Sequence, residues 1–170
     1  MIVKFRPMQA EDKELFKSFM RSLPRKDNYY LFIDVQNDHA IDRWMEKIHM
    51  GQTIGVVATN GSDMIGYCNL KTNGLAWTSH VGEICISVST AYRGRGIGKA
   101  LAEQIFLKAR VRGLQKLWTR MAISQDAAQH MFMKLGFRTE AVLSDFVKKE
   151  NGLTEDLVLM SHDSGEHWSF

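Results

Sequence analysis

A mixed α/β fold in one domain is the class that the sequence predicts, from three observations. Segments that alternate like strands and segments with the 3.6-residue period of helices follow one another along the chain. A glycine-rich turn separates a strand from a helix in mid-chain, and the strand–helix–strand unit from His80 to Ala122 implies two parallel strands. The 170 residues suffice for one sizeable core and are few for two. We therefore expect one mixed sheet of about seven strands with four helices packed on it.

The N-terminal third is predicted to form one strand and two helices. Residues 2–6 alternate as a short strand, and residues 11–23 place their apolar side chains on one helical face. The polar segment 24–28, which begins with Pro24, is expected to break that helix. A second helix is expected from about Asp38, with Gly51 as its C-terminal cap.

The remaining elements form a strand-rich middle and a helix–strand–helix–hairpin end. Asn60-Gly61 is predicted to supply the two positive φ angles of a tight hairpin turn. Ser124 is the expected N-cap of the last helix, which Gly136 ends. The domain is expected to cover residues 1–161 and to leave 162–170 as a loose tail. The predicted strands are 53–59, 64–71, 80–88, 116–122, 137–147 and 153–160, and the predicted helices are 97–112 and about 125–135.

Composition excludes several classes of function. A net charge of +3 without a stripe of Lys and Arg gives no reason to expect a nucleic-acid partner. The two cysteines, Cys68 and Cys85, have no metal-ligand spacing and are expected to be buried, reduced thiols, and we expect no metal. No apolar stretch approaches the roughly 20 residues that span a bilayer, and the N-terminus lacks the apolar core of a signal peptide. We expect a cytoplasmic protein with no membrane partner.

The strongest local signal is a glycine-rich turn between the strand that ends at Val88 and the following helix. Its glycines let the backbone turn sharply and present successive N–H groups on a concave surface, at the positive end of the helix dipole. Cationic side chains add donors at the rim. The pattern predicts a phosphate or pyrophosphate site. Its residues are Arg93, Gly94, Arg95, Gly96, Ile97, Gly98 and Lys99.

Two nucleotide-binding alternatives fail at specific residues, and a third alternative is structural. A dinucleotide fold needs Gly-x-Gly-x-x-Gly, but here the third glycine, Gly98, comes one residue too soon. A phosphate loop needs Ser or Thr after Gly-Lys, but Ala100 follows Lys99. A glycine turn that binds nothing and only bends the chain remains an alternative for this segment taken alone.

Two blocks in register resemble the GNAT superfamily of acetyl-CoA-dependent N-acetyltransferases. Arg93, Gly96 and Gly98 meet the family pattern Arg/Gln-x-x-Gly-x-Gly/Ala, after an apolar strand. Residues 125–137 resemble the family helix Asn-x-x-Ala-x-x-Leu-Tyr-x-Lys-x-Gly-Phe. The blocks are one helix and one strand apart, as in the family, and the resemblance extends from Ile2 to about Ser161.

The resemblance implies acetyl-CoA as co-substrate and a site for each of its parts. In the family two parallel strands, here 83–88 and 116–122, splay apart and pantetheine lies between them. The resemblance assigns pantetheine to backbone groups of Ile86, Ser87 and Val88, the thioester carbonyl to a backbone N–H near Val88, and pyrophosphate to the glycine turn. Gln125 stands where the family has the Asn that contacts the cofactor.

Proton handling is the least determined part of the implied mechanism. An ammonium has no lone pair, so the acceptor amine must lose a proton, and Glu83 is the expected base, directly or through water. A solvated or salt-bridged strand carboxylate is the alternative for Glu83, His80 is a weaker candidate, and Ser87 is a candidate to orient a water. Phe132 departs from the family Tyr that protonates the leaving thiolate; it is expected to pack against pantetheine or in the core. A non-catalytic acyl-CoA-binding module is therefore the alternative function.

The acceptor side is implied only as a region. In the family it is formed by the first two helices with their loop and by the last hairpin, here about 23–32 and 144–152. Tyr29, Tyr30 and Phe32 are expected either to wall an acceptor pocket or to join the core. The amine itself is unspecified, and a homodimer is an expectation of the resemblance alone.

Overall fold

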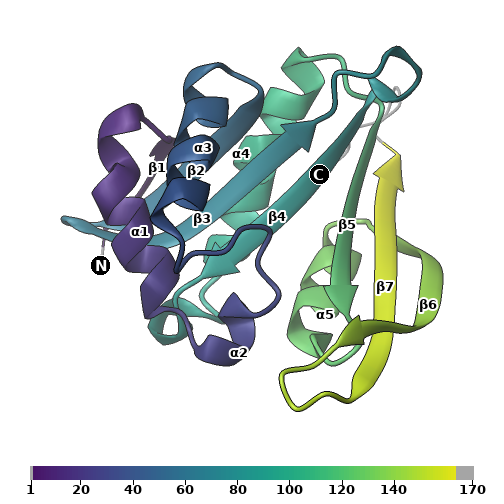
Figure 1. Cartoon of the computed structure of the whole chain (residues 1–170). Coiled ribbons are helices and arrows are strands. Elements are labelled where there is room, and N and C mark those ends of the chain that lie inside the picture. The colour runs from purple at the N-terminus through teal and green to yellow at the C-terminus, as the bar shows by residue number, and fades with distance from the viewer. Residues whose placement is uncertain (1, 164–170) are drawn as a thin grey trace.

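A seven-stranded mixed sheet with helices on both faces forms the body of the protein, in a computed structural model that describes residues 2–163 (Figure 1). The strand order is β1-β2-β3-β4-β5-β7-β6, and only the β4–β5 pair is parallel. This confirms the predicted fold class. The strands are β1 (Val3–Pro7), β2 (Thr53–Asn60), β3 (Asp63–Thr72), β4 (Val81–Val88), β5 (Lys116–Ala122), β6 (Arg138–Lys148) and β7 (Thr154–Asp163).

Residues 2–163 contain five α-helices, one more than the sequence predicted. The additional helix, α2 (Arg25–Asn28), is one turn long and lies in the segment that was expected only to break a helix. Pro24 directly precedes it, a position where its fixed φ and missing N–H are tolerated. The other helices are α1 (Lys13–Ser22), α3 (Asp38–His49), α4 (Ile97–Val111) and α5 (Asp126–Lys134), with short 3-10 turns at Ala10–Asp12, Ala76–Thr78 and Thr90–Tyr92.

Strand alternation divides the buried side chains into two cores, one on each face of the sheet. Val56 packs on the side of α4 and α5, and its neighbour Val57 packs on the side of α1 and α3. Phe106 of α4 lies in the first core, and Phe16 of α1 contacts Tyr67 of β3 edge-to-face in the second. The amphipathic helices that the sequence predicted therefore cover opposite faces of the same strands.

Two predicted local details are wrong by one residue. Asn60 pairs with Asp63, so the two turn residues are Gly61 and Ser62, and of these only Gly61 has a positive φ, +61°. The N-cap of α5 is Gln125 and not Ser124.

The C-terminal strand is longer than expected. β7 continues to Asp163 and pairs along its length with β5 and β6. It thus includes His162 and Asp163, which the sequence analysis assigned to a tail; residues 164–170 lie outside the described residues.

Gly82 is required where β4 and β5 come together. It pairs with Thr72 on one side and Leu117 on the other. A Cβ at this position would lie 2.6 Å from Leu70 Cδ1 and 2.9 Å from Leu114 Cδ1, closer than side chains approach in folded proteins. The absence of a side chain lets the core close over the paired ends of the two strands.

Replacement of Gly82 by Ala is expected to destabilise the fold by about 1–3 kcal/mol, because an added methyl group overpacks this part of the core. The free energy of unfolding is measured by urea titration. Gly74→Ala is the control: its Cβ meets nothing within 4 Å and its φ is outside the left-handed region. Equal stabilities of the two variants would contradict the packing argument.

Candidate active site

The sheet opens between β4 and β5. Their parallel pairing begins at Val81–Lys116 and ends at Glu83–Trp118, although β4 continues to Val88 and β5 to Ala122. Beyond Glu83 each strand keeps its other neighbour: β4 stays paired with β3, and β5 with β7. The two strands meet at one end and diverge toward the N-termini of α4 and α5 (Figure 1). The backbone of β4 from residue 84 to 88 thus has no strand on its β5 side, where an extended ligand has room to pair with it.

The glycine-rich turn lies at the open end of β4 and forms the N-terminus of α4. Gly94 and Gly96 have φ values of +74° and +79°, and Gly96 is the N-cap without any side-chain hydrogen bond to the helix. A Cβ added to either glycine meets no atom within 4 Å. The first N–H groups of α4 therefore face open space, the arrangement that binds phosphate groups at helix N-termini.

The three predicted cations of this turn have different partners. Arg93 donates from Nε to the Val88 carbonyl at 3.0 Å and from Nη2 to Asp27 of α2 at 2.6 Å. The guanidinium of Arg95 lies over the Tyr92 ring, 5.6 Å from its centroid. Lys99 is exposed and 3.7 Å from Glu103, one turn further along α4. The turn is cationic, but Arg93 is oriented by protein groups.

Ile97 and Gly98 serve the packing of the helices more than the surface of the turn. The Ile97 side chain is buried in the core, so only its backbone N–H is available to a ligand. A Cβ on Gly98 would lie 2.8 Å from the sulfur of Met131, so this glycine lets α5 approach α4. Two of the predicted ligand-binding positions thus have a structural reason of their own.

On the β5 side, Gln125 and Phe132 are placed by α5. The Gln125 side chain accepts a hydrogen bond from the Ala122 N–H at 2.9 Å, so its oxygen caps the end of β5. Phe132 is 3% exposed and packs edge-to-face on Phe137 at 4.9 Å. Of the two places expected for Phe132, the core is the one that the structure shows.

Glu83 stands at the last paired position before the strands diverge, between two cations. Its Oε2 lies 2.8 Å from Lys71 Nζ and its Oε1 lies 3.2 Å from Arg120 Nε. The carboxylate is therefore in the salt-bridged state that the sequence analysis held as an alternative. Lys71 and Arg120 are on the strands either side of β4, so the three charges form a row across the sheet, hereafter the charged row.

The other candidates on β4 lie at separate levels of the strand. His80 is exposed at the closed end, where its carbonyl accepts from the N–H groups of Gln115 and Lys116. Ser87 is half-buried at the open end, beside the predicted pantetheine groups. Burial raises the pKa of the Cys85 thiol to about 11 and the pKa of Cys68 well above its usual value, so neither is a thiolate at neutral pH.

Residues 24–36, which include α2 and are hereafter called the strap, connect the two halves of the opened sheet. Arg25 pairs with Glu150 of the β6–β7 hairpin at 2.8 Å, and Tyr29 Oη donates to the Lys148 carbonyl at 2.5 Å. The strap and the hairpin are the two regions that were expected to meet on the acceptor side, and the structure brings them together.

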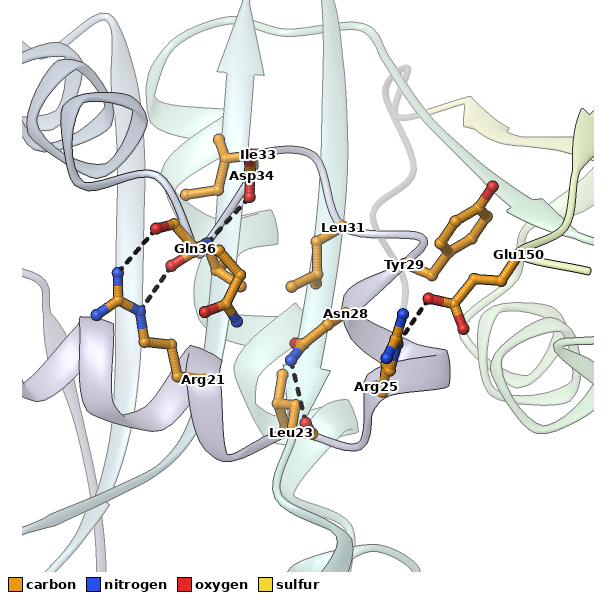
Figure 2. Close-up of a pocket in the computed structure, with 11 residues that line it drawn as sticks. Arg21, Leu23, Arg25, Asn28, Tyr29, Leu31, Ile33, Asp34, Gln36 and Glu150 are labelled. Atoms are coloured by element: carbon orange, nitrogen blue, oxygen red, sulfur yellow. Dashed lines mark hydrogen bonds and ion pairs between the residues drawn. The ribbon is translucent and has the colours of Figure 1, made fainter.

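A hollow of about 700 Å³ lies between the strap, the end of α1 and Glu150. Figure 2 shows Arg25 and Glu150 paired across one side of it and Arg21 bound to the backbone of the strap on the other. Tyr29 lines this hollow, and Tyr29 and Tyr30 line a smaller one of about 270 Å³ next to it. Phe32 lines neither; it packs on Trp44 in the second core, 4.4 Å between ring centroids.

Tyr30 reaches across the opening to a buried carboxylate on β7. Its hydroxyl donates to Glu155 Oε1 at 2.6 Å, and this bond raises the pKa of Tyr30. Burial opposes ionisation of Glu155, yet hydrogen bonds from Tyr30 and Ser124, with Lys149 nearby, hold the pKa of Glu155 below its usual range. The strap is thus held by an ionised carboxylate beneath it.

Sequence reasoning missed Lys71, Arg120, Asp27 and Glu155. The first two are separated from Glu83 by 12 and 37 positions, and only the register of three strands brings them together. The alternation of β5 offered a signal for Arg120. Residues 116–122 were predicted to run parallel to the strand of Glu83, and alternation places Trp118 and Arg120 on one face of that strand. No sequence signal pointed to Asp27 or Glu155.

Comparison with known proteins identifies the fold. The model of the acetyltransferase (GNAT) family matches residues 13–137. An N-acetyltransferase from Staphylococcus aureus Mu50 has a TM-score of 0.84 at 17% identity, over 96% of this chain and 99% of that one. A Salmonella typhimurium protein described as an acetyltransferase, and solved with its cofactor acetyl-CoA, has a TM-score of 0.81 at 18% identity, over 100% and 98%.

A curated relative matches in part. A ribosomal protein bS18-alanine N-acetyltransferase from Haemophilus influenzae is 28% identical over 76 residues, which are 45% of this chain and 51% of that protein. The matched region therefore spans about half the length of that relative.

A sheet opened between two parallel strands, with a glycine-rich turn at the mouth of the opening, is the arrangement of the acyl-CoA N-acyltransferase folds. The chain belongs to the GNAT family of acetyltransferases. The predicted family, the acetyltransferase class and acetyl-CoA as the co-substrate of that class are confirmed. Within residues 2–163 no helix is long and apolar enough to cross a membrane, and no three His, Cys, Asp or Glu side chains form a group suited to a metal ion.

Proposed function

We propose that this protein transfers the acetyl group of acetyl-CoA to a primary amine, by direct attack of the amine in a ternary complex. The observation that carries the proposal is the edge of β4 left unpaired by β5 beyond Glu83, which leads at Val88 to the turn and the uncapped N-terminus of α4. A free strand edge and a phosphate-binding turn at its end match the two chemical halves of coenzyme A, the pantetheine amides and the pyrophosphate. Their order along the chain is the order that such a ligand requires.

The catalytic contribution of this chain is mainly position. Backbone groups of Ile86, Ser87 and Val88 pair with the pantetheine amides, and the N–H near Val88 polarises the thioester carbonyl as negative charge develops on its oxygen. The turn from Arg93 to Lys99 holds the pyrophosphate and Gln125 borders the opening from β5. When the acceptor amine is held against this fixed thioester, the two groups react as if they belonged to one molecule. Much of the entropic cost of bringing them together is thereby removed from the reaction step.

Glu83 is assigned as the base, and its position favours transfer through water. It lies five residues from Val88, roughly 16 Å along a strand. Its ion pairs with Lys71 and Arg120 keep the carboxylate at the narrow end of the opening. Water molecules in the opening therefore carry the proton from the ammonium toward Glu83, and the neutral amine attacks.

The leaving thiolate departs without a protein acid at position 132. The Phe132 ring is in the core and has no proton to give, so the thiolate leaves unaided or takes a proton from water. The same observation favours the second candidate function, a non-catalytic acyl-CoA-binding module.

The cytoplasmic location and the homodimer stay predictions. The unbridged state of Cys68 and Cys85 supports a reducing compartment.

The protein is expected to release CoA thiol from acetyl-CoA in the presence of a suitable primary amine, with acetylated amine formed in equal amount. Calorimetric titration with acetyl-CoA, followed by thiol detection over an amine panel, measures binding and turnover separately. Binding without turnover on any amine would identify a binding module. Absence of binding would refute the proposal altogether.

Gly96→Ala is expected to weaken acetyl-CoA binding by about tenfold or more, because a Cβ would project into the space where pyrophosphate meets the α4 N-terminus. Gly113→Ala is the matched control, since Gly113 follows the other end of the same helix with φ +69° and equally open space. Both variants bear the same left-handed strain, about 1 kcal/mol. Calorimetry measures the affinity of each variant for acetyl-CoA. Similar affinities of the two variants would contradict pyrophosphate binding at this turn.

Glu83→Gln is expected to lower kcat by about 10²–10⁴-fold and to alter the pH–rate profile, since the amide accepts no proton. Acetyl-CoA affinity should stay nearly unchanged, because Glu83 lies outside the cofactor groups. Rates are measured from pH 5 to 10. A variant with the wild-type profile would exclude Glu83 as the base.

A further inference from the structure

We propose that the acceptor is a small amine that bears a carboxylate a few bonds from its amino group, an amino acid in chemical class, and that Arg120 binds this carboxylate. The inference rests on the proposed acetyl transfer and names its second substrate. It is carried by Arg120 of β5, to which the proposed chemistry gives only the ion pair that holds Glu83.

Arg120 lies beside the opening on the face of the sheet that the strap covers. Parallel pairing aligns Glu83 with Trp118, so Arg120, two residues further, is level with Cys85, beyond the last paired position. Its side chain shares a face with Trp118 and with Glu83, because its guanidinium contacts both. This is the face onto which Phe32 of the strap also packs, 5.9 Å from Lys71 Nζ.

The guanidinium of Arg120 is held in place from one side and open on the other. Nε is 3.2 Å from Glu83 Oε1, and the group lies over the Trp118 ring at 5.7 Å from its centroid. The Arg120 side chain is 52% exposed, and its closest contact with Glu83 is made by Nε and not by the terminal nitrogens. The two terminal nitrogens of a guanidinium held in this way match the two oxygens of a carboxylate.

The charge balance of the charged row also favours an anion. Lys71 and Arg120 bring two positive charges and Glu83 one negative charge, so the row has an excess of one positive charge. The other ion pairs around the mouth are one-to-one: Arg25 with Glu150, Arg93 with Asp27 and Lys149 with Glu155. A carboxylate on Arg120 would complete the balance at the place where the sheet opens.

The distance to the reacting atoms suits an amino group close to that carboxylate. The predicted thioester groups, Ile86 to Val88, are one to three residues beyond the level of Arg120, roughly 3–10 Å along the strand. A carboxylate bound to Arg120 lies about 2.8 Å from the guanidinium, and an attacking amine lies within about 3.5 Å of the thioester carbon. The few bonds between the carboxylate and the amino group of an amino acid cover the remaining distance. A polypeptide N-terminus has a neutral carbonyl group in place of this carboxylate.

The experiment compares acceptors that differ only at the carboxylate. The full-length protein is assayed with a panel of amino acids, each alongside its own carboxamide and its decarboxylated amine. Values of kcat/KM are expressed per unprotonated amine, because the three head groups alter the amine pKa. We expect the amino acid of the preferred side chain to exceed both analogues by about tenfold or more.

Variants of Arg120 then test whether this residue causes the preference for amino acids over their carboxamides. Arg120→Gln is expected to raise the KM for the amino acid by about tenfold or more, to leave the KM for acetyl-CoA unchanged, and to abolish the preference over the carboxamide. Arg120→Lys, which retains the charge without the fork, should recover part of it. Arg138→Gln is the control, an exposed arginine of β6 paired with Glu140 and Asp163, and should leave all three values unchanged.

Two results would overturn the inference while acetyl transfer stands: a wild-type protein that acetylates carboxamides or peptide N-termini as well as amino acids, or an Arg120→Gln variant with the wild-type preference. Thermal unfolding of each variant separates misfolding from lost recognition. Absence of thiol release with every amine, despite acetyl-CoA binding, would instead refute the proposed function and the inference with it.

Discussion

The early end of pairing between β4 and β5 is the constraint on which the remaining structure depends. Hydrogen bonding between the strands stops at Glu83, because each strand stays paired with its outer neighbour while the two directions diverge. A sheet interrupted in its centre leaves unpaired backbone groups, which cost free energy when they are buried away from water. A ligand with its own amide groups is suited to satisfy them, which is the physical reason for the proposed place of pantetheine.

The strap offsets part of that cost by linking the two halves. Arg25, Tyr29 and Tyr30 contact the hairpin and β7, while Asp27 contacts Arg93 at the glycine-rich turn. Exposed ion pairs contribute little individually, about 0–1 kcal/mol. The part-buried Tyr30–Glu155 hydrogen bond is expected to contribute more, because its acceptor is a charged carboxylate. One short helix thereby joins the acceptor side to the cofactor side.

Charge in the opening is arranged for position and recognition. Glu83 is ion-paired with Lys71 and Arg120, and the second of these contacts also holds the guanidinium of Arg120. Cys68 and Cys85 are protonated thiols, and Phe132 lies in the core. The proposed reaction therefore depends on the positions of the thioester and the amine, with proton transfer through water.

Hydrophobic periodicity, turn glycines and the spacing of two motifs determined the element order, the mixed sheet and the turn at Arg93–Gly98, because each of these is written in neighbouring residues. The short α2, the one-residue shift at Gly61 and the N-cap at Gln125 depend on weak local preferences that packing overrides. The charged row, the Asp27–Arg93 pair and the Tyr30–Glu155 bond join residues far apart in the chain. Only strand register and the path of the strap decide such contacts, since alternation tells which face a side chain takes but not which neighbour it meets there.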